Sequence, residues 1–248
     1  MATADDILVL DGVTRRFGGF LLDGISFRLR PGSVMGLLGP NGAGKTTTIK
    51  LILNLLHLDA GSISVFGLDS RRDELAIKRK LGYLGERAIL PPQGDALWLG
   101  RFLAVCFPEW DDRRYRHYLK RFGVPTAKPA GTLSKGTRTK LALAAAMGHR
   151  PGLLLMDEPT TGLDPLVRHE VVEAIREVAG DGRRAVLFST HIVSDLEAAA
   201  DAVTILDQGQ VIASEAKDRL LGRWPGLSLE EVFRRLVKTS SIEEESSS

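Results

Sequence analysis

Along roughly the first seventy residues, apolar and polar positions alternate with the period of two that is typical of half-buried β-strands. The segments ILVLDGVTRRF, LLDGISFRLRPG and SISVFGLD show this alternation, and turn residues separate them. Residues 33–39, SVMGLLG, are instead continuously apolar, as expected for a strand that is buried on both faces. Residues 46–58, TTTIKLILNLLHL, are then predicted to form a helix that is apolar on most of its faces.

From about residue 87 to residue 131 the pattern changes to that of helices, in ALWLGRFLAVCF and DDRRYRHYLKRFGV, and the loop PTAKPAG follows. Beyond it, the expected elements are the helix LALAAAMGHR, the strand GLLLM, the helix PLVRHEVVEAIREVAGDG, the strand AVLFST, the helix HIVSDLEAAA and the hairpin AVTILDQGQVIASE. This alternation predicts an α/β fold with a mostly parallel sheet. It also predicts an N-terminal antiparallel β subdomain and an α-helical subdomain inserted at about 87–135.

The C-terminal region is predicted to hold one more amphipathic helix, LSLEEVFRRLV, within residues 226–238. Ser228 and Glu231 have the spacing of a capping box, and the apolar positions that follow form one stripe suited to packing on the protein's own core. Residues 239–248 are acidic and rich in serine, which predicts a disordered tail.

The charge balance argues against a nucleic-acid-binding surface, because the chain has 33 basic and 31 acidic side chains. The start MATADDILVL has no basic and apolar regions of an export signal, and no uncharged apolar run approaches the roughly 18 residues of a membrane span. We therefore expect a cytoplasmic protein. The single cysteine, Cys106, lies in the apolar run FLAVCF, which predicts a buried and unreactive thiol.

A glycine-rich loop joins the buried strand at 33–39 to the helix at 46–58. Its residues are Gly39, Pro40, Asn41, Gly42, Ala43, Gly44, Lys45 and Thr46. Glycines let backbone N–H groups face a β-phosphate, and the dipole of the helix favours the same negative charge. Lys45 can reach the β- and γ-phosphates, Thr46 can ligate Mg²⁺ and Thr47 can add a hydroxyl contact. The loop therefore predicts a site for a nucleotide with Mg²⁺.

Two carboxylates follow the strand GLLLM, at the sheet edge where ligands of parallel sheets bind. Successive strand residues point in different directions, so Asp157 can face Mg²⁺ while Glu158 polarises a water that attacks the γ-phosphate. The alternative is a turn in which both carboxylates cap the next helix, but the neighbouring phosphate loop favours the catalytic interpretation.

His191 follows the strand AVLFST in the same edge position as Asp157. Its imidazole could hydrogen-bond the γ-phosphate or hold Glu158 in place, although a lone histidine is more often structural. Upstream of both of these strands, residues 132–140, TLSKGTRTK, place Ser134, Lys135 and Gly136 where a long apolar helix begins. That is the chemistry of a second helix N-terminus suited to an anion.

In this order, the motifs resemble those of the ATP-binding subunit of ABC transporters. GPNGAGKTT and LLLMDEP look like the two Walker motifs of that family, LSKGT its signature loop, TGLD its D-loop and STH its switch histidine. The resemblance covers about residues 6–236. It implies a P-loop NTPase core within residues 1–225 that uses ATP and Mg²⁺, and a helical insertion that docks on a membrane subunit.

In that family the ATPases pair head to tail, as homodimers or heterodimers, and each ATP lies between the phosphate loop of one copy and the signature loop of the other. The resemblance implies that Ser134, Lys135 and Gly136 contact the γ-phosphate of the partner's ATP. It also implies that Asp164 lies at the contact between copies. Phe17 stands where the family has an aromatic residue that stacks on adenine; an ordinary core phenylalanine is the alternative.

Three positions depart from the family's usual pattern. In the signature loop, Lys135 replaces a glycine and Thr137 replaces a glutamine. Glu86, in LGYLGERAILP, replaces a glutamine that senses Mg²⁺ and the water, and a carboxylate there could still ligate the metal. These variants, with LSLEEVF near the C-terminus, resemble the single-domain ATPases of drug, antibiotic and ion exporters.

The resemblance thus implies an ATP-hydrolysing motor subunit of an exporter, peripheral on the inner face of the cell membrane through a separate membrane subunit. Trp98, Leu99, Phe102 and Phe107 are candidates for the groove that receives this subunit's cytoplasmic helix, with packing inside the helical lobe as the alternative. A soluble ABC-type ATPase in translation or on DNA is the second hypothesis. A small-molecule kinase or GTPase would leave TLSKGT unexplained.

Overall fold

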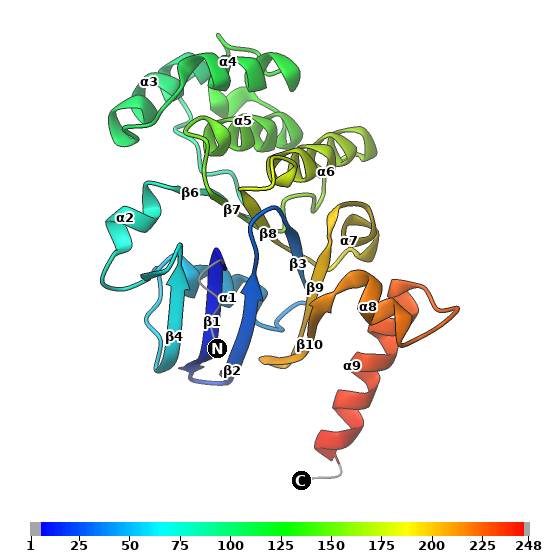
Figure 1. The fold of residues 1–248 in the computed structure, drawn as a ribbon. Helices are drawn as coiled ribbons and strands as arrows, with labels where there is room; N and C mark the ends of the chain where they lie inside the picture. The colour runs from blue at the N-terminus through cyan, green and yellow to red at the C-terminus, as the bar shows by residue number, and fades with distance from the viewer. Residues whose placement is uncertain (1–5, 246–248) are drawn as a thin grey trace.

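The computed structural model describes residues 6–245, and its centre is a six-stranded sheet (Figure 1). In spatial order its strands are β10 (Gln210–Ala216), β9 (Ala202–Asp207), β3 (Val34–Leu38), β8 (Ala185–Thr190), β7 (Leu153–Asp157) and β6 (Leu81–Leu84). The five strands from β9 to β6 are parallel, and β10 runs antiparallel to β9. Every residue of β3, β7 and β8 is buried, which is why these segments do not alternate in polarity.

A second, antiparallel sheet comes mostly from the N-terminal part of the chain. Its strands, in spatial order, are β2 (Phe20–Leu29), β1 (Leu8–Phe17), β4 (Ala60–Val65) and β5 (Leu68–Asp69). One hydrophobic core joins apolar side chains of β1 and β2 with those of β3, β7 and the helix α1 (Lys45–Ile52). The start of α1 is thereby fixed between the two sheets.

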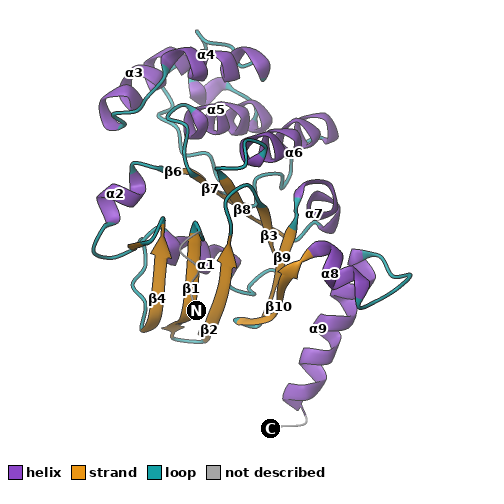
Figure 2. Ribbon diagram, in the orientation of Figure 1, coloured by secondary structure: helices purple, strands orange, loops and turns teal. Residues whose placement is uncertain are grey.

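The remaining helices are α2 (Glu74–Lys78), α3 (Ala96–Cys106), α4 (Asp112–Arg121), α5 (Lys135–Met147), α6 (Pro165–Ala179), α7 (Val193–Ala199), α8 (Lys217–Gly222) and α9 (Leu229–Glu245). α3 and α4 form a lobe at one end of the molecule, and α5 lies beneath them (Figure 2). Because α5 contacts both α4 and β6, it joins this lobe to the central sheet. The predicted α/β fold, with its antiparallel β subdomain and inserted helices, is confirmed.

Residues 81–84 form β6, a strand that the sequence analysis did not predict. Leu81 and Leu84 are buried, and the strand pairs in parallel with β7 at the edge of the sheet. The run is too short for its period to indicate a strand.

The helix α1 ends at Ile52 instead of continuing to residue 58. Asn54 adopts a positive φ of 53°, its N–H bonds the carbonyl of Leu51, and the N–H of Leu55 bonds the carbonyl of Lys50. This is a Schellman ending, and asparagine is one of the few residues besides glycine that tolerates it. The apolar pattern past Asn54 therefore does not extend the helix.

Cys106 is exposed, so the prediction of a buried thiol was wrong. The buried residues of α3 are Ala96, Leu99 and Gly100, all on its first two turns. Its last turn faces solvent, and Val105 beside the cysteine is 87% exposed. An apolar run in a short helix thus marks burial for only one end of it.

The last helix begins at the predicted capping box. The Ser228 N–H donates to Oε2 of Glu231 at 2.8 Å, and the Glu231 N–H donates to Oγ of Ser228 at 3.3 Å. Leu229 and Val232 are buried in the core. The tail predicted to be disordered at 239–248 is helical as far as Glu245, because no proline or glycine interrupts it and glutamate favours helices. Residues 246–248 lie outside the described part of the chain.

Candidate nucleotide-binding site

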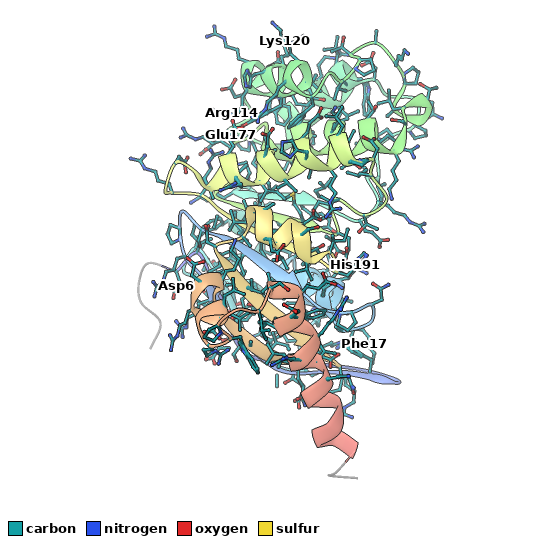
Figure 3. The ribbon with its side chains drawn as sticks, turned by 90° about the vertical axis from the view of Figure 1, so that its right-hand side faces the viewer. Asp6, Phe17, Arg114, Lys120, Glu177 and His191 are labelled. Atoms are coloured by element: carbon teal, nitrogen blue, oxygen red, sulfur yellow. The ribbon has the colours of Figure 1, made fainter. Side chains whose placement is uncertain are left out.

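A cavity of about 810 Å³ lies beside α1, where the loops after β3, β7 and β8 meet. The predicted site residues that line it are Phe17, Asn41, Gly42, Gly44, Lys45, Thr46, Thr47, Glu86, Glu158 and His191. Figure 3 shows Phe17 and His191 on the same side of the molecule, although one ends β1 and the other follows β8. Residues far apart in the sequence thus line the same cavity.

The phosphate loop has glycines where its backbone requires them. A Cβ at Gly39 would lie 2.3 Å from the carbonyl oxygen of Leu206, so no side chain fits there. Gly42 and Gly44 adopt φ angles of 85° and 105°, and Gly44 is the N-cap of α1. Ala43 is buried between them. The loop can therefore wrap closely around an anion at the start of α1.

Lys45, the first residue of α1, folds back over this loop. Its ammonium donates to the carbonyl oxygens of Gly39 at 2.7 Å and Pro40 at 3.1 Å, and it lies 3.2 Å from Oε1 of Glu158. The side chain is only 6% exposed. The loop therefore holds a buried cation that its own carbonyl oxygens and one carboxylate stabilise.

Asp157 and Glu158 point in different directions, as their strand-end position predicts. Oδ1 of Asp157 accepts hydrogen bonds from Oγ1 of Thr46 at 3.0 Å and from Oγ of Ser189 at 2.6 Å. Ser189 also accepts the Glu158 N–H at 2.9 Å, so one hydroxyl connects both acidic residues. Asp157 thus joins the start of α1 to two neighbouring strands.

The carboxylate of Glu158 faces the cavity and has three polar neighbours. Besides Lys45, its Oε2 accepts the hydroxyl of Thr161 at 2.8 Å and lies 2.8 Å from Nδ1 of His191. Burial raises the pKa of Glu158, but the Thr161 hydroxyl and the charges of Lys45 and His191 lower it by more. Glu158 is therefore ionised at neutral pH, and its proton-accepting form faces the cavity.

The backbone at Glu158 is strained, with a positive φ of 48°. Such a conformation costs roughly 1–3 kcal/mol in a non-glycine residue and persists where neighbouring contacts fix it. The Thr160 hydroxyl donates to Oδ2 of buried Asp195 at 2.5 Å, and Arg168 donates to Oδ1 of the same carboxylate at 2.6 Å. This cluster connects the loop after β7 to α6 and α7.

Ser189, Thr160, Thr161 and Asp195 were missed by sequence reasoning. The polar pair at the end of AVLFST and the threonines after the two carboxylates were the available signals. Asp195 gave no such signal, because it lies far along the chain on α7 and meets Thr160 only in the folded protein.

The predicted signature residues lie outside this cavity. Ser134 is the N-cap of α5 and its Oγ accepts the N–H of Thr137 at 3.2 Å, while the ammonium of Lys135 donates to the carbonyl of Thr161 at 2.7 Å. Gly136 lies in the first turn of α5, and a Cβ there would touch Val167 of α6 at 3.4 Å.

The start of α6 lies beside this first turn of α5. Asp164 is the N-cap of α6 and accepts the N–H of Val167 at 3.1 Å. Ser134, Lys135 and Asp164 are all exposed. Two helix starts thus open to solvent side by side.

Phe17 and Glu86 lie at the margins of the cavity. Phe17 is half-buried, and the guanidinium of Arg15 lies 5.1 Å from the centre of its ring. Glu86 is exposed and also lines an adjoining groove. Both side chains line the cavity. The predicted contact of Phe17 with adenine and that of Glu86 with a metal are therefore compatible with their positions.

The adjoining groove is mainly apolar and has a volume of about 1010 Å³. Leu99, Phe102 and Phe107 line it, whereas Trp98 does not and stacks on Phe102 with ring centres 5.4 Å apart. Phe102 is 51% exposed. The groove runs between the helical lobe and the central sheet.

Within residues 6–245, no three His, Cys, Asp or Glu side chains are grouped so that they could hold a metal ion by themselves. Over the same residues, no helix combines the length and the apolar character needed to span a bilayer.

Known proteins are similar to this chain in sequence and in fold. The family described as "ABC transporter" matches residues 22–161. The daunorubicin resistance ATP-binding protein DrrA3 of Streptomyces coeruleorubidus is 37% identical over 237 residues, covering 93% of this chain and 75% of that protein. The Nod factor export ATP-binding protein I of Burkholderia lata is 34% identical over 233 residues, covering 89% and 74% respectively. A solved structure of an ATP-binding subunit of an ABC transporter aligns with a TM-score of 0.85 and 28% identity, over 93% of this chain and 99% of that one.

The phosphate loop, the paired carboxylates and these likenesses define a P-loop ATPase, and the chain belongs to the ABC transporter family as an ATP-binding subunit. The predicted function as the ATP-hydrolysing subunit of an ABC transporter is confirmed. The relatives named here serve drug resistance and Nod factor export. The alternative in translation or on DNA finds no support among these relatives.

Proposed function

We propose that two copies of this fold, identical or closely related, hold ATP head to tail between the cavity of one and the start of α5 of the other. The observation that carries the proposal is that the chain has two polar helix starts suited to an anion in different places. The start of α1 lines the cavity, whereas Ser134, Lys135 and Gly136 are absent from its lining; Ser134 and Lys135 are exposed and Gly136 is half-buried. A second molecule's nucleotide can therefore reach them.

In the first copy, the phosphates occupy the loop formed by Gly39, Asn41, Gly42, Ala43 and Gly44. Backbone N–H groups and the dipole of α1 favour the negative charge. The ammonium of Lys45 moves from its carbonyl partners to the β- and γ-phosphates, and Thr47 adds a hydroxyl contact. Phe17 covers one face of the adenine ring.

Mg²⁺ fits the residues between the loop and β7. The Thr46 hydroxyl and the Asp157 carboxylate are 3.0 Å apart, and Glu86 adds a carboxylate at the margin of the same cavity. Oxygen donors of this kind are those that Mg²⁺ prefers. These three residues would hold the ion, which neutralises charge on the β- and γ-phosphates when bound.

Glu158 is the proposed general base. Its carboxylate is ionised and faces the cavity, so it can accept a proton from a water beside the γ-phosphate. His191 fixes the orientation of this carboxylate through its Nδ1 contact, and its other ring nitrogen can reach the phosphate.

The second copy contributes Ser134, Lys135 and Gly136 to the γ-phosphate, and Asp164 lies at the contact between the copies. α5 adds its dipole to this contact. The bound γ-phosphate therefore holds the two copies together, and its hydrolysis releases them.

A membrane subunit docks in the apolar groove formed by Leu99, Phe102 and Phe107, beside the cavity. A partner helix that lays its apolar face there would cover the exposed ring of Phe102. In this arrangement the chain is cytoplasmic and peripheral on the inner face of the cell membrane, and it exports a substrate that the membrane subunit selects.

The catalytic assignment is tested by comparing MgATP binding and turnover in the unaltered protein and in Glu158→Gln. We expect the variant to bind ATP as before and to hydrolyse it at least 100-fold more slowly, since general-base catalysis contributes roughly 10²–10⁴-fold. Unchanged turnover would exclude Glu158 as the base. Loss of binding would show instead that the carboxylate supports the nucleotide pocket.

A further inference from the structure

Lys135 stands where the family usually has a glycine, and the structure gives its side chain a partner within the same chain. The ammonium donates to the carbonyl oxygen of Thr161 at 2.7 Å. Thr161 belongs to the loop after β7, so the contact joins the first residue of α5 to the loop that carries Glu158. A glycine at position 135 has no side chain with which to make it.

The contact continues to the proposed base. The hydroxyl of Thr161 donates to Oε2 of Glu158 at 2.8 Å, on the oxygen that also faces His191. Thr161 therefore holds Lys135 through its carbonyl group and Glu158 through its side chain. Two hydrogen bonds, one of them from a charged donor, span the distance from α5 to the carboxylate.

The loop has a backbone that depends on such contacts. Glu158 has a φ of 48° and Gly162 a φ of 67°, and a Cβ at Gly162 would lie 2.8 Å from Nζ of Lys135. Thr160, the residue before Thr161, is fixed by buried Asp195. Lys135 and Asp195 thus hold adjacent residues of one strained segment.

We propose that Lys135 is a positioning residue for catalysis: it holds Thr161 so that the threonine hydroxyl orients the carboxylate of Glu158. The inference rests on the proposed role of Glu158 as the base. It also connects the two nucleotide sites of a dimer, because the residue proposed to meet the partner's γ-phosphate is bonded to the loop of its own catalytic carboxylate. An ammonium has three N–H donors and can serve both acceptors.

The experiment measures ATP turnover, KM and ATP binding in Lys135→Ala, Lys135→Arg, Thr161→Val and the double variant Lys135→Ala/Thr161→Val. Lys140→Ala is the matched control, because Lys140 pairs with Glu170 at 2.5 Å and joins α5 to α6 without touching the loop. We expect Lys135→Ala to lower kcat roughly tenfold with KM changed less than about twofold, since misplacement of a catalytic group reduces kcat. Arginine should restore most of the rate, and Lys140→Ala should leave it near the unaltered value.

The double variant separates positioning from a direct phosphate contact. If Lys135 acts through Thr161, the double variant should be no slower than the slower single variant. Effects that multiply, a change in KM alone, or an equal loss in Lys140→Ala would overturn the proposal. If the unaltered protein turns over ATP and Glu158→Gln does not, any of these overturning results would exclude the role of Lys135 and leave Glu158 as the base. Turnover that survives in Glu158→Gln removes the proposed base itself.

Discussion

The ammonium of Lys45 lies 3.2 Å from Oε1 of Glu158, so the cation of the phosphate loop and the proposed base neutralise each other across the cavity. Their side chains are 6% and 11% exposed. In the proposed mechanism, a bound triphosphate offers Lys45 a more highly charged partner, and the departure of Lys45 would leave Glu158 free to act on water. Phosphate binding and release of the base would then be one event.

Lys45→Ala should abolish tight ATP binding. Removing a buried charged partner of phosphate typically costs about 2–5 kcal/mol, which corresponds to a loss of affinity of roughly 30-fold to several thousand-fold. Calorimetric titration with MgATP measures it. Lys50→Ala is the control, since Lys50 is on the same helix and exposed at the margin of the cavity, and its variant should bind within about threefold of the unaltered protein. Equal affinities for both variants would contradict the role of Lys45.

Gly39→Ala should destabilise the fold and weaken ATP binding together. The added Cβ would lie 2.3 Å from the Leu206 carbonyl oxygen, a backbone atom of β9 that cannot move alone. We expect a loss of about 2 kcal/mol or more in the free energy of unfolding, measured in urea. At Gly19, in the turn between β1 and β2, a Cβ would meet nothing within 4 Å, so Gly19→Ala is the control. Similar losses in both variants would show that the close approach at Gly39 is not what matters.

The sequence predicted the elements that carry the phosphate loop and the two carboxylates, because the periods and motifs there are local. It could not predict the contact of Glu158 with Thr161, which depends on the strained conformation of the loop, or that of Thr160 with Asp195, which depends on how the loop packs against α7. The exposure of Cys106 was wrongly predicted for a related reason. Hydrophobicity along the chain does not say which end of a helix packs against other elements.

Ser189→Ala should reduce turnover more than ATP binding. The hydroxyl of Ser189 donates to Asp157 at 2.6 Å and accepts the Glu158 N–H at 2.9 Å, so its loss leaves both groups short of a partner. We expect a stability loss of about 1–3 kcal/mol and a kcat reduced at least tenfold. Thr204→Val removes another buried hydroxyl of the same sheet, one that bonds Ser214 at 2.8 Å away from the cavity. That control should lose stability without loss of kcat. An equal loss of kcat in Thr204→Val would show that Ser189 supports only the packing of the sheet.

Asp181 should give the protein a pH-dependent increment of stability. Burial raises the pKa of its carboxyl, but the N–H groups of Arg183 and Arg184 and the guanidinium of Arg184 lower it by more, from 3.8 to about 2. Because the pKa is lower in the folded state, the stabilisation is complete above the unfolded value and is lost as pH falls from about 4 to about 2. Urea unfolding of the unaltered protein and Asp181→Asn should therefore differ by a constant amount above pH 5 and converge in acid. A gap that does not change with pH would exclude this carboxylate as its source.

The direct test of the shared nucleotide is the molecular mass of Glu158→Gln in solution with saturating MgATP, measured by light scattering coupled to size exclusion. Slow hydrolysis should trap a dimer, and adding Ser134→Arg to the same chain should return it to a monomer that still binds ATP, because the start of α5 is then blocked. A Glu158→Gln protein that stays monomeric with ATP bound, or a dimer that Ser134→Arg does not disturb, would contradict nucleotide sharing between two copies.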